Sequence, residues 1–293
     1  MEREYLIGVD LGGTKIEAGL VDLNGKVIKK IIMPTEAKAG KAKVIENIVY
    51  AVNKLRRDKI LGVGIGIPGP TDYRRGIAIN PPNLPGWTEV PLKKILEEKL
   101  KLCVAVENDA KCFAIAEYKC GYEKKVSSLV GVTVGTGVGA GIIINGKIFR
   151  GSSDSAGEIG HMTVVENGEK CNCGSRGCLE MYASGRGIER MYFEKTKRKL
   201  SAEEIAQLVS KNKTAKMVID EAAKYLGIGL ANLIVTVNPE AVVIDGSIAL
   251  IKGFVEKAEK EAQKHLGILP KPVRIEHSKT EDAGILGAAS VVF

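Results

Sequence analysis

Several features that define common protein classes are missing from this sequence of 293 residues. No apolar run approaches the roughly 20 residues that a membrane-spanning helix needs, and no leader segment precedes the first apolar strand. Cys103, Cys112 and Cys120 have no spacing typical of a disulfide framework. We therefore expect a protein without a membrane partner that works in a reducing cytoplasm.

The chain also lacks a concentrated basic stripe, although its net charge is +8. Its lysines are scattered among glutamates along the expected helices, which is typical of solvated helix faces. We therefore expect no nucleic-acid partner, and the positive charge can instead help to attract anionic small molecules. With 45% hydrophobic residues, the chain can build about two domains with proper cores.

One histidine and three cysteines lie close together in the sequence. Between Cys173 and Cys178 lie two glycines, Gly174 and Gly177, that let a short loop fold back on itself; Cys171 precedes Cys173 by two residues, and His161 precedes Cys171 by ten. Buried core thiols are the alternative, but this segment has no apolar periodicity. A Cys₃His set is typical of structural zinc, so we expect these four residues to hold one Zn²⁺.

Two carboxylates flank the expected zinc loop. Glu158 lies three residues before His161, so the two share one face of a helical turn. Glu180 follows Cys178 by two residues. Zinc binding would therefore hold two carboxylates and an imidazole near one another.

Two Gly-Thr turns lie between apolar strands. The first, residues 11–15, joins strands expected over 5–10 and 16–21, and the second is residues 135–137. No helix follows the first turn, which excludes the P-loop and the dinucleotide fingerprint. Two glycines alone favour an ordinary tight hairpin. The sequences around both turns align with one gap, however, which indicates a domain duplication whose paired turns could hold a polyphosphate.

The remaining pattern alternates strands and helices and predicts an α/β fold. Further strands are expected over 61–67, 102–106, 241–244 and 273–276. Helices are expected over about 44–55, 91–99, 108–119, 185–194, 201–210, 214–236, 247–264 and 284–291.

Asn108 and Asp109 follow the strand expected over 102–106. Ligands of open α/β sheets bind beyond the carboxyl ends of strands, whereas an Asp at this position is also a common helix N-cap. This segment alone leaves both interpretations of Asp109 open. Gly246 and Ser247 leave a similar choice between a phosphate or adenosine site and an ordinary turn.

Taken together, these features resemble the ROK family of sugar kinases and repressors, within the actin-like, hexokinase-like ATPase superfamily. The resemblance covers essentially the whole chain. Its most specific motifs are the Gly-Glu-Ile-Gly-His segment that ends at His161 and the cysteine-rich segment that ends at Glu180. The other matching motifs are Asp10 to Lys15, Gly66 to Gly69, Asn108-Asp109 and Gly135 to Gly139.

The resemblance implies two duplicated ribonuclease H-like domains with a cleft between them. Residues 1–118 would form a smaller amino-terminal α/β domain, and residues 119–283 a larger one that carries the zinc loop. The closing helix, 284–293, would return to the first domain. Sugar binding would draw the domains together and expel water. A homodimer is the implied assembly, with a tetramer as the alternative.

The resemblance also implies the roles of site residues. Asp109 would be the general base that takes the proton from the sugar hydroxyl. Zinc would be structural, and its ligand His161 would also bind the sugar. The implied sugar-binding residues are Gly69, Asn83, Asn108, Asp109, Glu158, His161 and Glu180. The implied ATP-binding residues, with Mg²⁺ near Asp10, are Asp10, Gly12, Gly13, Thr14, Lys15, Gly135, Thr136, Gly137, Gly246 and Ser247.

The implied activity is ATP-dependent phosphorylation of a hexose at its 6-hydroxyl, with glucose as the first candidate. N-acetylmannosamine, N-acetylglucosamine, mannose or fructose could use the same hydrogen-bonding set, and polyphosphate or another nucleotide could replace ATP. A sugar-sensing regulator is the alternative class. Such repressors carry a helix-turn-helix domain before the first Gly-Thr turn, for which the position of Asp10 leaves no room, so we expect an enzyme.

Overall fold

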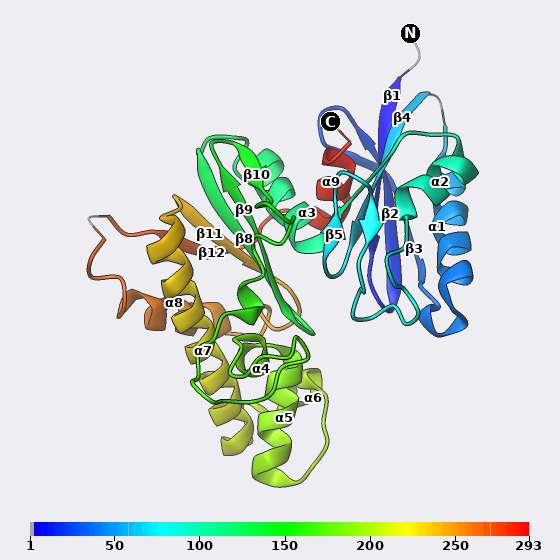
Figure 1. Cartoon of the computed structure of the whole chain (residues 1–293). Coiled ribbons are helices and arrows are strands. Elements are labelled where there is room, and N and C mark those ends of the chain that lie inside the picture. Colours follow the sequence, from blue (N-terminus) through cyan, green and yellow to red (C-terminus); the bar gives the residue numbers. More distant parts are fainter. Residues whose placement is uncertain (1–2, 58, 270, 293) are drawn as a thin grey trace. The chain divides into compact units, whose positions relative to one another are not determined.

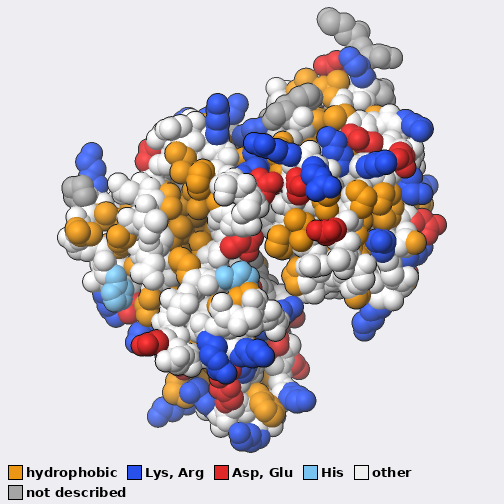
Figure 2. Space-filling view, in the orientation of Figure 1, with side chains coloured by type: hydrophobic (Ala, Val, Ile, Leu, Met, Phe, Trp, Pro, Cys, Tyr) orange, Lys and Arg blue, Asp and Glu red, His pale blue; other side chains and the backbone are white. Residues whose placement is uncertain are grey.

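Two five-stranded sheets with helices packed on them form the described part of the chain, residues 3–57, 59–269 and 271–292, in the computed structural model (Figure 1). This confirms the expected mixed α/β class. No helix within these ranges is long and apolar enough to cross a membrane. On the face drawn in Figure 2, Lys and Arg side chains are interspersed with Asp and Glu and form no continuous basic stripe.

The first sheet is built on the strands that flank the first Gly-Thr turn, in the order β3-β2-β1-β4-β7. Strand β1 pairs antiparallel with β2 and parallel with β4, and β4 pairs parallel with β7. The carboxyl ends of these three parallel strands, at Leu11, Ile67 and Asn108, therefore lie at the same end of the sheet. The strands are β1 (Glu4–Leu11), β2 (Lys15–Asp22), β3 (Val27–Pro34), β4 (Lys59–Ile67) and β7 (Val104–Asn108).

Two amphipathic helices complete the core of the first sheet. Helix α1 (Lys41–Leu55) and helix α2 (Leu92–Leu100) bury their apolar stripes in one cluster with the strands. The loop before α2 contributes Trp87, which is 3% exposed and belongs to this core. A short two-stranded sheet, β5 (Thr71–Asp72) and β6 (Ile77–Ala78), follows β4.

The second sheet repeats the strand order of the first, as β10-β9-β8-β11-β12. Strand β11 pairs parallel with both β8 and β12, and β9 pairs antiparallel with β10. The carboxyl ends of β8 and β11, at Val134 and Asp245, consequently lie side by side. The strands are β8 (Ser128–Val134), β9 (Val138–Ile144), β10 (Lys147–Phe149), β11 (Ala241–Asp245) and β12 (Arg274–His277).

Side-chain caps define three of the helices between β10 and β12. Ser184 caps α5, Ser201 and Glu204 form a capping box on α6, and Asn212 caps α7. The three predicted helices in this region are therefore confirmed within two or three residues at each end. The helices are α4 (Glu180–Ala183), α5 (Gly185–Thr196), α6 (Ala202–Leu208), α7 (Lys213–Val237) and α8 (Phe254–Gln263).

The segment after β11 differs from the helix predicted over 247–264. Residues 246–253 form successive turns, and α8 begins only at Phe254. Gly253 adopts a φ of 77°, which a helix does not tolerate. The prediction of a helix start at Ser247 is therefore wrong, and Ser247 lies in a turn.

Helices α3 (Asp109–Ala116) and α9 (Ala283–Ser290) pack through backbone that glycines leave bare. A methyl group on Gly8 or Gly64 would collide with backbone of α9, and one on Gly287 would collide with the carbonyl of Cys112 in α3. A π-helical turn, Glu117–Gly121, extends α3. Close backbone packing thus fixes α3, whose first residue is Asp109.

The contacts divide the chain into two compact units. The first contains residues 1–125, 141–156 and 279–293, and the second contains 126–140 and 157–278. The predicted division at residue 118 differs, because Gly141 packs directly against α3: a Cβ on Gly141 would lie 2.6 Å from the Cβ of Ala114. The first unit thereby gains residues 141–156 and is the larger of the two, contrary to the prediction.

Candidate functional site

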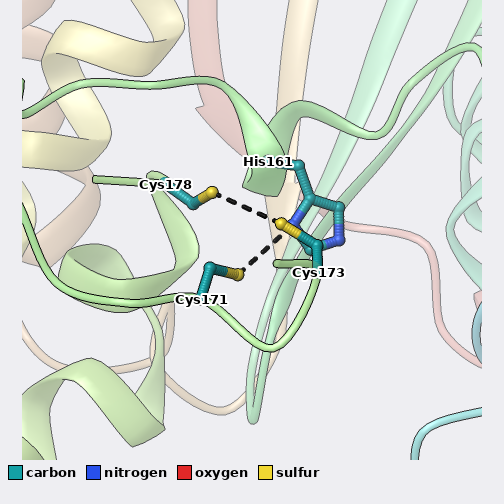
Figure 3. Close-up of side chains that lie close together, drawn as sticks. All are labelled: His161, Cys171, Cys173 and Cys178. Carbon is teal, nitrogen blue, oxygen red and sulfur yellow. Dashed lines mark hydrogen bonds between the residues drawn. The ribbon is translucent and has the colours of Figure 1, made fainter. Parts of the chain in front are cut away.

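The four expected zinc ligands lie together in the second unit (Figure 3). Their ligand atoms all lie within 4.8 Å of one another. The Sγ of Cys171 is 3.6 Å from Nδ1 of His161, and the Sγ of Cys173 is 3.7 Å from that of Cys178. In a tetrahedral site with Zn–S bonds of about 2.3 Å, two sulfurs lie about 3.8 Å apart. The four groups therefore fit one Zn²⁺.

Glycines let the cysteine-rich loop turn back on itself. Gly174 and Gly177 adopt φ values of 96° and 73°, which favour glycine. The N–H of Ser175 lowers the pKa of the Cys173 thiol to about 7, whereas burial raises the pKa of Cys178 to about 12. A lowered thiol pKa favours the thiolate, which is the form that binds a metal.

Glu158 and His161 share one turn, as their spacing predicts. The 3₁₀ turn Ile159–His161 follows Glu158, and the N–H of His161 donates to the carbonyl of Glu158 at 3.1 Å. The second ring nitrogen of His161 points away from the thiols (Figure 3). It can hydrogen-bond a ligand while Nδ1 faces the metal.

The Gly-Thr turn of the second unit, residues 135–137, lies against Glu180. Oε2 of Glu180 accepts a hydrogen bond from the N–H of Val138 at 3.1 Å, and a methyl group on Gly137 would collide with the same oxygen. The N–H of Gly185, at the start of α5, donates to the carbonyl of Gly135 at 2.8 Å. The turn is thus fixed by a carboxylate on one side and a helix start on the other.

Gly246 and Ser247 lie beside this turn. A Cβ on Gly135 would lie 3.7 Å from Oγ of Ser247. Gly246 adopts a φ of 111°, so the backbone reverses directly after β11. A cavity of about 310 Å³ opens next to Ser247, between the turns after β11 and helix α6. Its walls include Ala202, Ala206, Gln207, Ile248 and Ile251.

The Gly-Thr turn of the first unit is held by a buried threonine. Thr35 is fully buried, and its hydroxyl donates to the carbonyl of Gly12 at 2.6 Å. The N–H of Thr35 donates to the carbonyl of Thr14 at 2.9 Å. A Cβ on Gly13 would lie 2.5 Å from the Cβ of Asn83. The loop that carries Asn83 therefore packs directly on the turn.

Asp10 ends up beside the start of α9, where a methyl group on Gly284 would collide with its carboxylate. The pKa of Asp10 is raised to about 6, chiefly by burial and then by the nearby Glu17, while Lys15 and Lys30 act in the opposite direction. Mg²⁺ is commonly held by one or two carboxylates together with phosphate oxygens. The Asp10 carboxylate fits this role, since a cation would relieve the cost of its ionisation.

The sequence left open whether Asp109 caps the helix that follows or faces a ligand. In the structure Asn108 is the cap residue, and Asp109 is the first residue of the helix. Asn108 is the N-cap of α3, and its Oδ1 accepts from the N–H of Lys111 at 3.1 Å. Oδ1 of Asp109 accepts from the N–H of Ala110 at 2.8 Å and from Nδ2 of Asn108 at 3.1 Å. The N-cap interpretation of Asp109 is therefore wrong. Nδ2 of Asn108 also lies 3.1 Å from the carbonyl of Gly69, to which it donates.

The predicted residues form two groups, one in each unit. Gly69 joins the loop of Asn83 to α3, because a Cβ on Gly69 would lie 2.9 Å from Pro82. The first group is Asp10, Gly12, Gly13, Thr14, Lys15, Gly69, Asn83, Asn108 and Asp109. The second group is Gly135, Thr136, Gly137, Glu158, His161, Cys171, Cys173, Cys178, Glu180, Gly246 and Ser247.

Three residues that shape these groups were not predicted. Thr35, Gln207 and Arg150 lie outside every motif. In the fold, Thr35 contacts Gly12, Gln207 lines the cavity beside Ser247, and Arg150 contacts Glu107. Of these three residues, only Arg150 could have been anticipated from the sequence. Glu107 lies at the end of a strand expected to be buried, and a buried carboxylate requires a basic partner.

Comparison with known proteins gives the family. Residues 6–293 match the ROK family. The chain belongs to the ROK family. A solved ROK family glucokinase from Streptomyces griseus, in complex with glucose and AMPPNP, superposes with a TM-score of 0.86 at 31% identity, covering 98% of both chains.

Relatives in this family differ in named function. The N-acetyl-D-glucosamine kinase of Vibrio cholerae is 36% identical over 301 residues, covering 96% of this chain and 97% of that protein. The xylose repressor of Caldicellulosiruptor bescii is 34% identical over 311 residues, covering 98% of this chain and 77% of the repressor. The chain is thus similar over most of its length both to a protein named as a sugar kinase and to one named as a xylose repressor.

Proposed function

We propose that this chain is an ATP-dependent sugar kinase that phosphorylates the 6-hydroxyl of a hexose, with glucose as the first candidate. The observation that carries this proposal is the half-buried Asp109 at the carboxyl end of β7. Two hydrogen bonds to its Oδ1 fix the carboxylate, from Ala110 and from the cap residue Asn108. Membership in the ROK family and the likeness to a glucokinase with bound glucose and AMPPNP support it.

The proposed chemistry assigns Asp109 one task. Its carboxylate accepts the proton of the sugar hydroxyl as that oxygen attacks the γ-phosphorus, while the bond from the γ-phosphorus to the β,γ-bridging oxygen breaks and ADP leaves. Phosphoryl transfer depends mostly on positioning and on neutralising charge. The fixed orientation of Asp109 is therefore its main contribution.

The sugar ligands proposed from the second unit are Glu158, His161 and Glu180. Carboxylates accept hydrogen bonds from sugar hydroxyls, and the imidazole nitrogen that points away from the thiols, which carries the proton when Nδ1 binds the metal, donates one to a sugar oxygen. Bound zinc would supply structural rigidity and would fix the tautomer of His161. Gly69, Asn83 and Asn108 are the corresponding proposals from the first unit.

The nucleotide ligands proposed are the two Gly-Thr turns and the Gly246-Ser247 turn. Exposed backbone N–H groups in glycine turns suit phosphate oxygens, and Asp10 would hold Mg²⁺, which neutralises phosphate charge. The cavity beside Ser247 is lined by Ala202 and Ala206 together with Glu203 and Gln207 of α6, and by Ile248 and Ile251 of the turns after β11, a mixture of apolar surface and a few polar groups that suits a nucleobase. Adenine would then sit between α6 and the turns after β11.

The repeated strand order supports a further proposal, that the two halves arose by duplication. Each half carries one Gly-Thr turn after a strand of equivalent position, β1 or β8. We propose that the two units close on the bound sugar and exclude water as a competing phosphoryl acceptor. We also propose a homodimer, which light scattering would test.

A sugar-responsive regulator without kinase activity is the second candidate, and the likeness to a xylose repressor favours it. A coupled ADP-release assay with ATP, Mg²⁺ and a panel of hexoses, N-acetylhexosamines and xylose separates the two. We expect turnover with glucose and a large fall of kcat, to a small residual value, in Asp109→Asn, with calorimetric sugar affinity retained. Sugar binding without turnover, with either ATP or polyphosphate as donor, would refute the kinase proposal and favour the regulator.

A further inference from the structure

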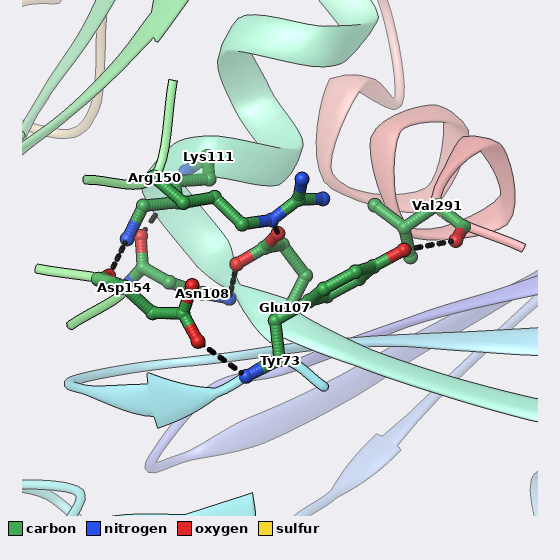
Figure 4. Close-up of polar contacts among 7 residues, drawn as sticks. All are labelled: Tyr73, Glu107, Asn108, Lys111, Arg150, Asp154 and Val291. Atoms are coloured by element: carbon green, nitrogen blue, oxygen red, sulfur yellow. Dashed lines mark hydrogen bonds and ion pairs between the residues drawn. The ribbon is translucent and has the colours of Figure 1, made fainter. Parts of the chain in front are cut away.

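A buried carboxylate lies directly behind the proposed base. Glu107, the residue before Asn108 on β7, has no exposed side-chain surface. Its Oε1 accepts from the backbone N–H of Asn108 at 2.9 Å, and its Oε2 accepts from Nε of Arg150 at 2.7 Å (Figure 4). Since Asn108 also holds Oδ1 of Asp109, an unbroken series of hydrogen bonds runs from Arg150 to Asp109.

Arg150 is held on a second side by an aromatic ring. Its guanidinium lies 3.7 Å from the ring centroid of Tyr73, and its side chain is 23% exposed. Tyr73 is anchored in turn, because its N–H donates to Oδ2 of Asp154 at 3.0 Å and its hydroxyl reaches the carbonyl of Val291 at 3.4 Å. The guanidinium therefore has a defined orientation toward Glu107.

A buried lysine ties the same loop to α3. Lys111 is 1% exposed, and its Nζ donates to the carbonyl of Asp154 at 2.6 Å. The N–H of Lys111 meanwhile donates to Oδ1 of Asn108. Asp154, in the loop after β10, is thus bound by α3 and by Tyr73 at once, as Figure 4 shows.

Such a buried network of charged groups stabilises the fold no better than apolar packing of the same volume would. Burying a carboxylate costs several kcal/mol before its partner compensates, and an apolar pair of the same volume often stabilises a fold equally well. The Glu107–Arg150 pair also lies at the end of β7, next to a cap and a candidate base, and not in the middle of the core. Its position suggests that the pair orients Asn108 and Asp109.

We propose that Glu107 and Arg150 are positioning residues that hold Asn108 and Asp109 in the orientation for proton abstraction. This inference rests on the proposed role of Asp109. Arg150 fixes Glu107, Glu107 fixes the peptide of Asn108, and the Asn108 amide fixes Asp109. Tyr73 and Asp154 hold Arg150 and its loop in place.

The test compares Arg150→Met, Glu107→Gln and the double variant in the ADP-release assay. We expect Arg150→Met to lower kcat at least tenfold while the KM for the sugar changes less than threefold. Glu107→Gln keeps an acceptor for Asn108 and should lower kcat less. The double variant should recover toward Glu107→Gln, because it contains no unpaired buried carboxylate.

A second comparison separates positioning from a merely structural role. In an Asp109→Asn background, Arg150→Met should leave the residual kcat unchanged within twofold, because Arg150 acts only through Asp109. A further tenfold loss in that background would overturn the proposal. So would a kcat of Arg150→Met within twofold of the native chain, or a double variant that loses the product of both single effects.

Two further variants control for folding. Asp154→Gly removes the acceptor of Tyr73 but suits the φ of 57° at this position, so it should fold and lower kcat three- to tenfold. An unchanged kcat in folded Asp154→Gly would overturn the proposal even if Arg150→Met does not fold. Lys257→Met removes an ion pair with Asp220 between α7 and α8 and should keep kcat within twofold.

The outcomes distinguish this inference from the proposed function. Absence of turnover in the native chain across all sugars and donors refutes the kinase and removes the base that Arg150 would position. Turnover in the native chain, with loss in Asp109→Asn but not in Arg150→Met, keeps the kinase and overturns only the positioning role.

Discussion

Replacing Gly137 by alanine should weaken sugar binding without unfolding the second unit. A Cβ at this position would lie 3.3 Å from the carboxyl carbon of Glu180 and closer still to Oε2. A carbon and an oxygen need about 3.4 Å or more, so the carboxylate must move by about 1 Å. Glu180 is the end of a flexible side chain, and Gly137 has no positive φ, so the backbone can stay in place.

The displacement should cost Glu180 its hydrogen bond from Val138 and, if our proposal for the sugar site holds, its hydrogen bond to the sugar. A hydrogen bond to a charged group contributes about 1.5–3 kcal/mol. The sugar dissociation constant should therefore rise by about tenfold to a hundredfold. Calorimetry without nucleotide measures this directly, using the sugar that gives turnover.

Gly135→Ala, in the same turn, is the matched control. Its Cβ would meet only Oγ of Ser247, at an ordinary 3.7 Å, so sugar affinity should stay within threefold of the native value. Equal sugar affinity in both variants and in the native chain would refute the reasoning, because Glu180 would then not contact the sugar. Equal loss in both would instead mean that any side chain in the turn disturbs the site.

Two further changes test the metal assignments. Cys173→Ser should abolish stoichiometric zinc in elemental analysis and lower sugar affinity through His161, whereas Cys103→Ser, outside the cluster, should keep the metal; zinc retained in Cys173→Ser would exclude the ligand set. In metal-free protein, Asp10→Asn should raise the thermal midpoint at pH 7.5, because a pKa raised from 3.8 to about 6 means that ionisation above pH 6 costs stability, about 1–3 kcal/mol. Below pH 4 the carboxyl is protonated in both folded and unfolded chains, so the difference between the variants should shrink there; a pH-independent difference would contradict the assignment.

Strands, turns and helices were predictable where residues close in the sequence determine them. The first Gly-Thr turn and its two strands follow from alternating apolar residues around glycines, and α7 follows from a long apolar period with Asn212 as its cap. The Cys₃His cluster was predictable because four potential zinc ligands close in sequence leave few geometries. Their proximity in the fold agrees with that reasoning.

Long-range packing was not predictable in the same way. The turns after β11 interrupt a good helical pattern at Gly253, whose φ of 77° the spacing of apolar residues does not reveal. Residues 141–156 join the first unit because Gly141 meets α3 and Arg150 meets Glu107 across 43 residues of sequence. Periodicity carries no information about such pairs.

The packing of α9 on Gly8 and Gly64 also has a consequence for folding during synthesis on the ribosome. The first sheet cannot complete its core until Ala283–Ser290 have been synthesised, although its last strand ends at Asn108. At about 5–20 residues per second, the ribosome takes on the order of ten to thirty seconds to cover that interval. During this time the strands around Gly8 and Gly64 lack their covering helix. The face of the sheet that α9 covers in the finished protein is therefore open to other contacts throughout this interval.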